Sequence, residues 1–316
     1  MTMRRRWMME RDPPEHTRLR TPVARTFTPR RVSVLTSEFE ALADRLLDDC
    51  LAMGRFDAMR DYALPLVHGS MARMSGIPEE RHVRFSEGVR DIEMIDNTRE
   101  SVEHMATAVE QLGALFGELL SKRRARPRDD LISAIAAVEQ DALDWEDRVA
   151  TCVLIISAAA GVTVGAIGNS LRALLDNPGE CKRFRDGSAA PGDAVEELLR
   201  FDPTPVGLVR SAREDLVAFD VHMKKGEQVI ALVGAANRDP KAFDEPDRID
   251  LTRRPLTDLA FGNGRHFCLG ASLARAQVGV ALQRLLERAP NIQRTPDPLA
   301  WRGGLQRVLS SLRVSV

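Results

Sequence analysis

Most of the chain carries apolar residues at the three- and four-residue spacing of an α-helix. Between residues 35 and 53, for example, Leu42, Leu46, Leu47 and Leu51 recur at helical spacing beside charged residues, which is typical of a helix with one buried face. The same pattern predicts further helices at 61–74, 80–95, 103–124 and 271–286, with a polar link at 96–99. The pattern alone therefore predicts a mainly helical protein.

The longest predicted helix begins after Asp144, a residue type that caps helix N-termini, and ends near Asp176, just before Asn177-Pro178-Gly179. Residues 153–171 contain no charged side chain. A soluble helix that is apolar on every side is buried. We therefore expect this helix to cross the core of the protein.

Short alternating apolar runs predict a small β region beside the helices. They cover residues 206–212, 216–219 and 228–233. The C-terminal residues 301–316 have the pattern of a hairpin, with Leu305 near its turn. The expected fold class is therefore mainly α with a small β region.

Composition and charge narrow the class of protein further. The 316 residues are 44% hydrophobic, and no linker or repeat divides them, so we expect one domain over residues 1–316. A net charge of −1 gives no reason to expect a nucleic-acid partner. No signal peptide and no apolar run long enough to span a bilayer is evident, which predicts a cytoplasmic protein without a membrane partner. The cysteines lack the close pairing of a zinc site or a disulfide framework; they are Cys50, Cys152, Cys181 and Cys268.

One cysteine lies in a glycine-rich stretch, Phe-Gly-Asn-Gly-Arg-His-Phe-Cys-Leu-Gly, at residues 261–270. Gly262 and Gly264 allow backbone conformations closed to other residues, so this loop can approach a flat ligand. Cys268 comes just before a predicted helix N-terminus, where the helix dipole and free N–H groups favour a thiolate. A thiolate held in this way suits the axial position of haem iron. The alternative is a structural cysteine in an ordinary turn.

This stretch resembles the cysteine-ligand loop of the cytochrome P-450 family of haem-thiolate monooxygenases, whose pattern is Phe-x-x-Gly-x-x-x-Cys-x-Gly. Phe261, Gly264, Cys268 and Gly270 fill its fixed positions. The resemblance implies haem b bound through Cys268 and the oxidation of a hydrophobic small molecule, in secondary metabolism. It also implies a bacterial, cytoplasmic enzyme with a ferredoxin-type electron donor, for which Arg18 and Arg265 are candidate contacts.

The resemblance also implies a set of donors for the haem propionates. His16 and Arg20 are four residues apart and so share a helix face, as in the matching helix of bacterial family members. Arg210 and His266 match two further propionate partners of the family. Without the resemblance, His16 and Arg20 would be read as a solvated basic helix face.

A second family element is Glu-x-x-Arg, which Glu197 and Arg200 match. Its usual third partner is an arginine in a later irregular segment, and the resemblance places Arg248 there. A buried charged network of this kind needs all its members, because each one compensates the desolvation of the others. We therefore expect these three residues to be structural.

The central helix resembles the family helix that passes over the haem, where small residues such as Ala158 allow close approach. The alternative is a packed core helix without a ligand. The family usually has an acid followed by an alcohol here; those positions fall on Gly161 and Val162, with Thr163 next. If one position is deleted, Thr163 keeps the alcohol. In either alignment no carboxylate occurs between Arg148 and Leu175.

The remaining implications concern the pocket and the start of the chain. The expected pocket is apolar and is lined by Ala158, Gly161, Val206, Leu208 and Leu305. The family has N-terminal helices, strands and a roof loop ahead of the helix with His16, so we expect a family-like fold without these parts and an unusually open pocket. Two other readings stay open: a peroxide-dependent or isomerase-like haem enzyme, and a degenerate scaffold with weak or no catalysis.

Overall fold

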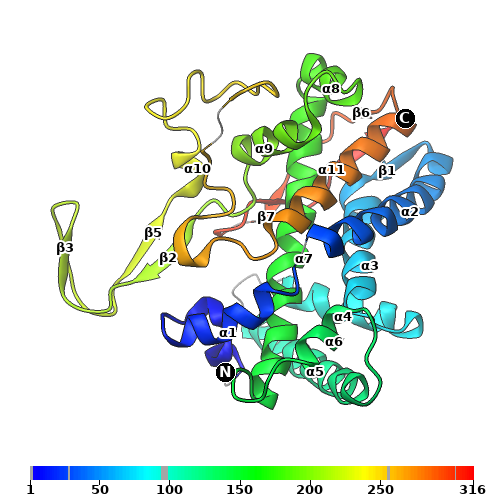
Figure 1. Cartoon of the computed structure of the whole chain (residues 1–316). Coiled ribbons are helices and arrows are strands. Elements are labelled where there is room, and N and C mark those ends of the chain that lie inside the picture. The colour runs from blue at the N-terminus through cyan, green and yellow to red at the C-terminus, as the bar shows by residue number, and fades with distance from the viewer. Residues whose placement is uncertain (1–2, 28, 94–98, 255–256, 303) are drawn as a thin grey trace.

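The computed structural model describes residues 3–27, 29–93, 99–254, 257–302 and 304–316. Helices make up most of it, and the strands form small sheets beside them (Figure 1). This confirms the predicted fold class, mainly α with a small β region.

The central element is α7 (Trp145–Leu175), which runs through the middle of the protein (Figure 1). The Asp144 side chain caps it by accepting a hydrogen bond of 2.7 Å from the Asp147 N–H group. Most of its side chains are buried, and it packs against α3, α4, α5, α9 and α11. The predicted core helix is thus confirmed, and it forms the frame to which the other elements attach.

By length and composition α7 is also the one helix of the described residues that could cross a membrane, which corrects the expectation that no apolar run is long enough. However, 72% of its most apolar window is buried inside the protein. The core helix of a soluble protein passes the same test, so the composition of α7 is weak evidence for a membrane span.

Most of the other helices follow the predicted pattern, with differences at their ends, but α6, α8 and α10 were not predicted. They are α1 (Glu15–Ala24), α2 (Pro29–Met53), α3 (Leu64–Met74), α4 (His82–Glu93), α5 (Arg99–Ala125), α6 (Leu131–Ala136), α8 (Pro178–Arg185), α9 (Pro191–Phe201), α10 (Val233–Ala236) and α11 (Ala271–Arg288). The helix predicted from Asp61 begins instead as a π-helical turn over Ala58–Ala63, which Asp57 caps by accepting from the Met59 N–H group. Of the predicted link at 96–99, Arg99 instead begins α5, whereas residues 96–98 and the end of the preceding helix at Ile95 lie outside the described residues.

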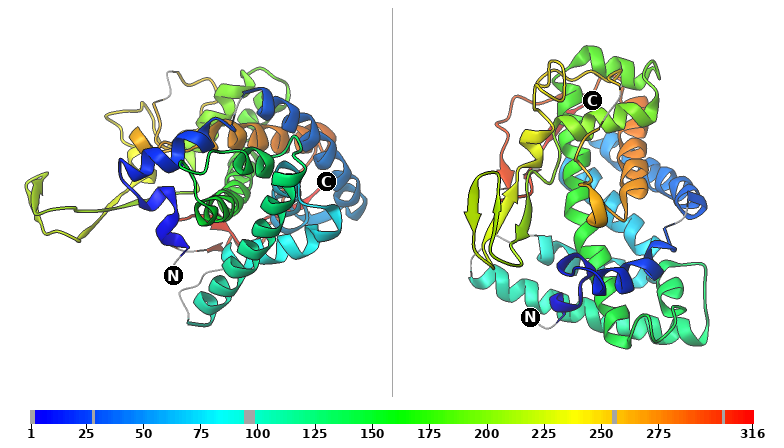
Figure 2. Two further views of the ribbon diagram at one scale, coloured as in Figure 1. Left: turned by 60° about the horizontal axis from the view of Figure 1, so that its bottom comes forward. Right: turned by 60° about the vertical axis from the view of Figure 1, so that its left-hand side comes forward.

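The strands pair antiparallel throughout the described residues. A three-stranded sheet has the order β1 (Arg55–Asp57), β9 (Arg313–Ser315), β6 (Gln293–Arg294). Three two-stranded sheets are β2 (Leu208–Ser211) with β5 (Gln228–Ala231), β3 (Leu216–Ala218) with β4 (Val221–Met223), and β7 (Trp301–Arg302) with β8 (Val308–Leu309). The β2–β5 and β3–β4 pairs form a ribbon that projects from the helical body (Figure 2). The sequence pattern predicted strands of this ribbon and the C-terminal hairpin but missed β1, β4 and β6.

Candidate functional site around Cys268

The loop before α11 is folded by its glycines and by one hydrogen bond across its base. Gly262 and Gly264 have φ of 71° and 74°, a region that L-residues with side chains rarely adopt. The Cys268 N–H group donates to the Phe261 carbonyl oxygen at 3.0 Å, and α11 begins at Ala271. The predicted arrangement of a tight loop, a cysteine and then a helix is therefore what the chain adopts.

Burial dominates the chemistry of the Cys268 thiol. It raises the pKa of the thiol, while a backbone hydrogen bond with Gly270 and the charges of Arg20 and Arg275 lower it. The raised pKa corrects the expectation that the helix start alone favours the thiolate, because burial outweighs these contributions. A thiol that coordinates a metal ion is deprotonated by it, so this site suits a thiolate that forms on binding a metal.

Four residues that can donate hydrogen bonds lie beside this loop: His16 and Arg20 on α1, Arg210 on β2, and His266 in the loop itself. The rings of His16 and His266 lie 4.4 Å apart between centroids. Burial, followed by the positive charges nearby, lowers the pKa of both rings. Arg20 donates to the Phe267 carbonyl oxygen, and Arg210 donates to the carbonyl oxygen of the preceding residue at 2.8 Å.

These donors have room for an anionic ligand. Among the ion pairs of the described residues, neither Arg20 nor Arg210 has a carboxylate partner. The His16 Nε2 atom is buried and has no hydrogen-bond partner, which is unusual for a buried polar atom. Carboxylates such as haem propionates pair well with arginine forks. The residues present therefore fit haem, and the expected set His16, Arg20, Arg210 and His266 comes together.

A stretch of α7 is uncovered, although the rest of this helix is mostly buried. Ala158 is exposed, and Gly161 and Val162 are half-buried on the same face, as their spacing requires. Thr163 is buried and lies about 140° around the axis from Ala158, at roughly 100° per residue. The structure thus places Gly161 and Val162 on the uncovered face and Thr163 away from it. The helix is unbroken through these residues.

The remaining expected pocket residues come from two segments that pair with each other. The Val206 N–H group donates to the Leu305 carbonyl oxygen at 2.9 Å. A Leu208 methyl group lies 3.6 Å from where a Cβ on Gly262 would stand, so Leu208 packs against the cysteine loop. Cβ positions on Gly264 and Gly270 would meet nothing within 4 Å. The loop therefore has free space beside it, as a flat ligand requires.

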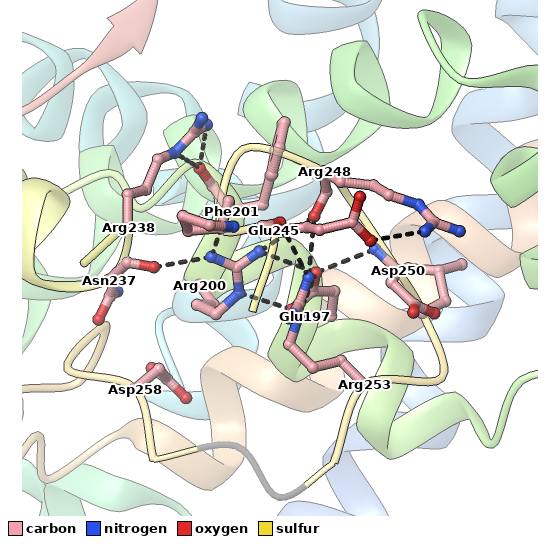
Figure 3. A network of polar contacts seen from close by, with 12 residues as sticks. Glu197, Arg200, Phe201, Asn237, Arg238, Glu245, Arg248, Asp250, Arg253 and Asp258 are labelled. Atoms are coloured by element: carbon pink, nitrogen blue, oxygen red, sulfur yellow. Dashed lines mark hydrogen bonds and ion pairs between the residues drawn. The ribbon is translucent and has the colours of Figure 1, made fainter. Parts of the chain in front are cut away.

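Behind the loop, Glu197 and Arg200 on α9 form a fully buried ion pair (Figure 3). The two hydrogen bonds between them are 2.6 and 2.9 Å long. Arg200 also donates to the carbonyl oxygens of Asn237 and Pro246, at 2.7 and 3.1 Å. These contacts anchor the irregular segment that leads to the cysteine loop.

The prediction that the Arg248 side chain is the third member of this network is wrong. Its side chain is 63% exposed and pairs with Glu245 at 3.0 Å, and it contributes only its carbonyl oxygen, which accepts from Arg200 and Arg253. Arg253 takes the expected place: its side chain is 12% exposed, and its Nε atom lies 3.2 Å from a Glu197 oxygen. The Arg248 side chain therefore points toward Glu245 and not toward Glu197, while its carbonyl oxygen faces Arg200 and Arg253 (Figure 3).

Sequence reasoning also missed an ion pair next to the loop. Arg275 on α11 donates two hydrogen bonds to Glu196 on α9. Its guanidinium carbon lies 4.3 Å from the centroid of the Phe261 ring. The only signal in the sequence is an arginine two turns after the cysteine, which by itself is ordinary for an exposed helix face.

Comparisons with known proteins agree with this geometry. A family model described as Cytochrome P-450 matches residues 193–289. Cytochrome P-450 107B1 of Saccharopolyspora erythraea is 37% identical over 314 residues, which cover 97% of this chain and 76% of the relative. Vitamin D(3) 25-hydroxylase of Pseudonocardia autotrophica is 36% identical over 316 residues, covering 98% and 77%. The structure of the bacillaene polyketide synthase cytochrome P-450 PksS of Bacillus subtilis 168 matches with a TM-score of 0.93 and 33% identity, covering 98% of this chain and 80% of that one.

Proposed function

Since this chain belongs to the cytochrome P-450 family and is an oxidoreductase of the monooxygenase type, we propose that it binds haem b through the Cys268 thiolate and oxidises a hydrophobic small molecule. The resemblance seen in the cysteine loop is thereby confirmed, and the family implies a haem cofactor. One observation carries the assignment of the site. A half-buried cysteine on a glycine-turned loop lies beside four donors, and neither arginine among them pairs with a carboxylate of the described residues.

Each residue of the loop and its neighbours has a role in this proposal. Cys268 would hold the haem iron through its thiolate, since a cysteine that binds a metal gives up its proton. His16, Arg20, Arg210 and His266 would hold the propionates. Phe261, Gly262 and Gly270 would shape the loop that presents the sulfur to the haem. When bound, haem supplies the redox chemistry with dioxygen.

The substrate side of the proposal rests on α7 and the β2 and C-terminal segments. Ala158, Val206, Leu208 and Leu305 are apolar and would border the proposed pocket, with Gly161 and Val162 on the uncovered face of α7. These side chains exclude water and offer no charged group, which favours a hydrophobic substrate. Thr163, the next residue along α7, is buried and lies away from this face, so we do not propose a contact between its hydroxyl group and the substrate.

For the electron supply we propose a ferredoxin-type donor and a cytoplasmic location, with residues 1–316 acting as one domain and with no nucleic-acid or membrane partner. Arg18 is engaged by Glu15 and Asp147, at 2.9 Å each. Arg265 is exposed on the cysteine loop itself. Arg265 is therefore the better candidate of the two for a contact with an acidic donor.

One observation favours a second candidate function. The uncovered face of α7 has no carboxylate, and none occurs between Arg148 and Leu175. Proton delivery to dioxygen at such a site lacks its own acid. A peroxide-dependent or isomerase-like haem enzyme does not need that acid. A catalytically weak scaffold is the further alternative, and it predicts poor haem incorporation.

The test is the spectrum of the reduced, carbon monoxide-bound protein. We expect the band of a thiolate-ligated haem in the wild type and its loss in Cys268→Ala, because the ligand is removed. Cys181→Ala is the matched control, since Cys181 is half-buried on α8 and has no role in the proposed site. Cys268→Ala with an unchanged thiolate band contradicts the assignment. A wild-type protein that takes up no haem supports the scaffold instead.

A further inference from the structure

Arg275 is held rigidly although a third of its side chain is exposed. Its Nη2 atom donates to Glu196 Oε2 at 3.1 Å, and its Nε atom donates to the other oxygen of the same carboxylate. The side chains of Arg275 and Glu196 are 33% and 21% exposed. Two parallel hydrogen bonds from a planar fork fix the orientation of the guanidinium group as well as its position.

The guanidinium group faces the ring of Phe261, the first residue of the cysteine loop. The 4.3 Å between its carbon atom and the ring centroid is a cation–π distance. The Phe267 ring lies 6.4 Å from the same Phe261 ring, centroid to centroid. Phe261 is thus held between an element of the helical body and the residue that precedes the cysteine.

The backbone of Phe261 links this contact to the cysteine. Its carbonyl oxygen accepts the 3.0 Å hydrogen bond from the Cys268 N–H group. A shift of the Phe261 ring therefore moves the acceptor that closes the loop. Glu196 comes from α9, which also carries the buried pair of Glu197 and Arg200, so the position of the loop is tied to the helix that holds this buried pair.

We propose that Arg275, clamped by Glu196 and stacked on Phe261, is a positioning residue that sets the geometry of the loop that carries Cys268. The inference rests on the proposed role of Cys268 as the haem ligand. Holding the loop needs the fork and the ring stack together, which a lysine does not reproduce.

The test compares Arg275→Lys, Arg275→Met and Glu196→Gln with the wild-type full-length protein. Arg284→Met is the matched control, because Arg284 lies on the same helix, is 34% exposed and also donates two hydrogen bonds to one carboxylate, that of Asp44. Three quantities are measured: the hydrogen-exchange rate of the Cys268 amide, the thiolate fraction in the reduced carbon monoxide spectrum, and the midpoint potential of the haem.

We expect the Cys268 amide to exchange about three- to tenfold faster in Arg275→Met, as the loss of a cation–π contact and an ion pair implies. The thiolate fraction should fall and the midpoint potential should change in the same variant. Arg275→Lys and Glu196→Gln should lie between it and the wild type, and Arg284→Met should match the wild type in all three measurements.

Two results overturn the inference. One is Arg275→Met with wild-type exchange, spectrum and potential. The other is an equal change in Arg284→Met, which makes the effect a general one of α11. If Arg275→Met fails to fold, the same three measurements on the milder variants Arg275→Lys and Glu196→Gln decide whether Arg275 positions the loop. A wild type without a thiolate band contradicts the proposed function, whereas amide exchange still decides whether Arg275 holds the loop.

Discussion

The carboxyl group of Asp258 lies in the segment that leads to the cysteine loop, near the network of Figure 3. Burial raises its pKa, and the charge of Glu196 raises it further, against a hydrogen bond from the Ala260 N–H group and the charge of Arg275. The folded protein therefore binds a proton at Asp258 more tightly than the unfolded chain does. The stability that this group contributes is present below its unfolded pKa and is lost as the pH rises through the raised, folded value.

Asp258→Asn should remove this pH dependence, because the amide cannot ionise and its oxygen can still accept from the Ala260 N–H group. The free energy of unfolding of the wild type, relative to the variant, is expected to fall as the pH rises from below the ordinary aspartate pKa. Denaturant unfolding over a pH series measures it. Asp220→Asn is the control, in an exposed turn whose φ of 61° asparagine tolerates. A difference that is flat with pH contradicts this account of Asp258.

Single residues were predictable from sequence where their partners are close along the chain. Cys268, its glycines and the following helix lie within a short stretch, so local rules of backbone conformation apply. The raised pKa of the thiol was not predictable, because it depends on the burial of Cys268 by distant segments. Arg275 was missed for the same reason: Glu196 and Phe261 meet it only in the folded chain.

Mutations in the buried network test which arginine of the irregular segment, Arg248 or Arg253, is the partner of Glu197. Glu197 is fully buried and binds both Arg200 and Arg253, so Glu197→Ala leaves buried charge uncompensated and should cost about 3–5 kcal/mol. Arg253→Ala should cost about 1–3 kcal/mol through lost hydrogen bonds to buried groups. Arg248→Ala should stay within about 0.5 kcal/mol, because its side chain is on the surface.

Denaturant unfolding of the haem-loaded proteins measures these three costs, and Arg248→Ala serves as the matched control for Arg253→Ala. If Arg248→Ala lowered the free energy of unfolding more than Arg253→Ala did, Arg248 would be the third partner, as the sequence suggested. A Glu197→Ala protein with near wild-type stability would show that the buried pair is dispensable.

Whole elements were predictable to the extent that their apolar pattern was long. The ends of α7 were set by the Asp144 cap and by Pro178, and both are readable in the sequence. Short elements depend on neighbours that the pattern does not contain. β1, for example, exists because Arg55, Phe56 and Asp57 pair with β9 at the other end of the chain. The π-helical turn before α3 likewise has no signal in the apolar spacing.

At the scale of the molecule, the arrangement of the helices was predicted from the resemblance of one loop to a known family and not from the spacing of apolar residues. Amphipathic spacing says which face of a helix is buried but not which helix covers it. That α7 packs against α11 and α9 follows from the fold of the family, which the match to PksS at a TM-score of 0.93 bears out. The pattern was also ambiguous for α7, whose composition suits both a membrane span and a protein core.

The last prediction concerns how completely the enzyme couples reductant to product. Hydroxylation takes one dioxygen, two electrons, two protons and one substrate, and gives product and water; the uncoupled reaction gives hydrogen peroxide from the same dioxygen, electrons and protons. The outcome therefore depends on proton delivery at the site. On the uncovered face of α7 stand Gly161 and Val162, with no carboxylate between Arg148 and Leu175.

We expect the wild type to release much of its oxygen as peroxide, and Gly161→Glu combined with Val162→Thr to raise the ratio of product to reductant consumed. Gly161→Gln with Val162→Thr is the control, since it matches the size of the new side chains without adding an acid, and haem content checks that the pocket tolerates them. Tight coupling in the wild type with its true substrate would contradict the prediction, because it would mean that ordered water or a substrate hydroxyl delivers the protons.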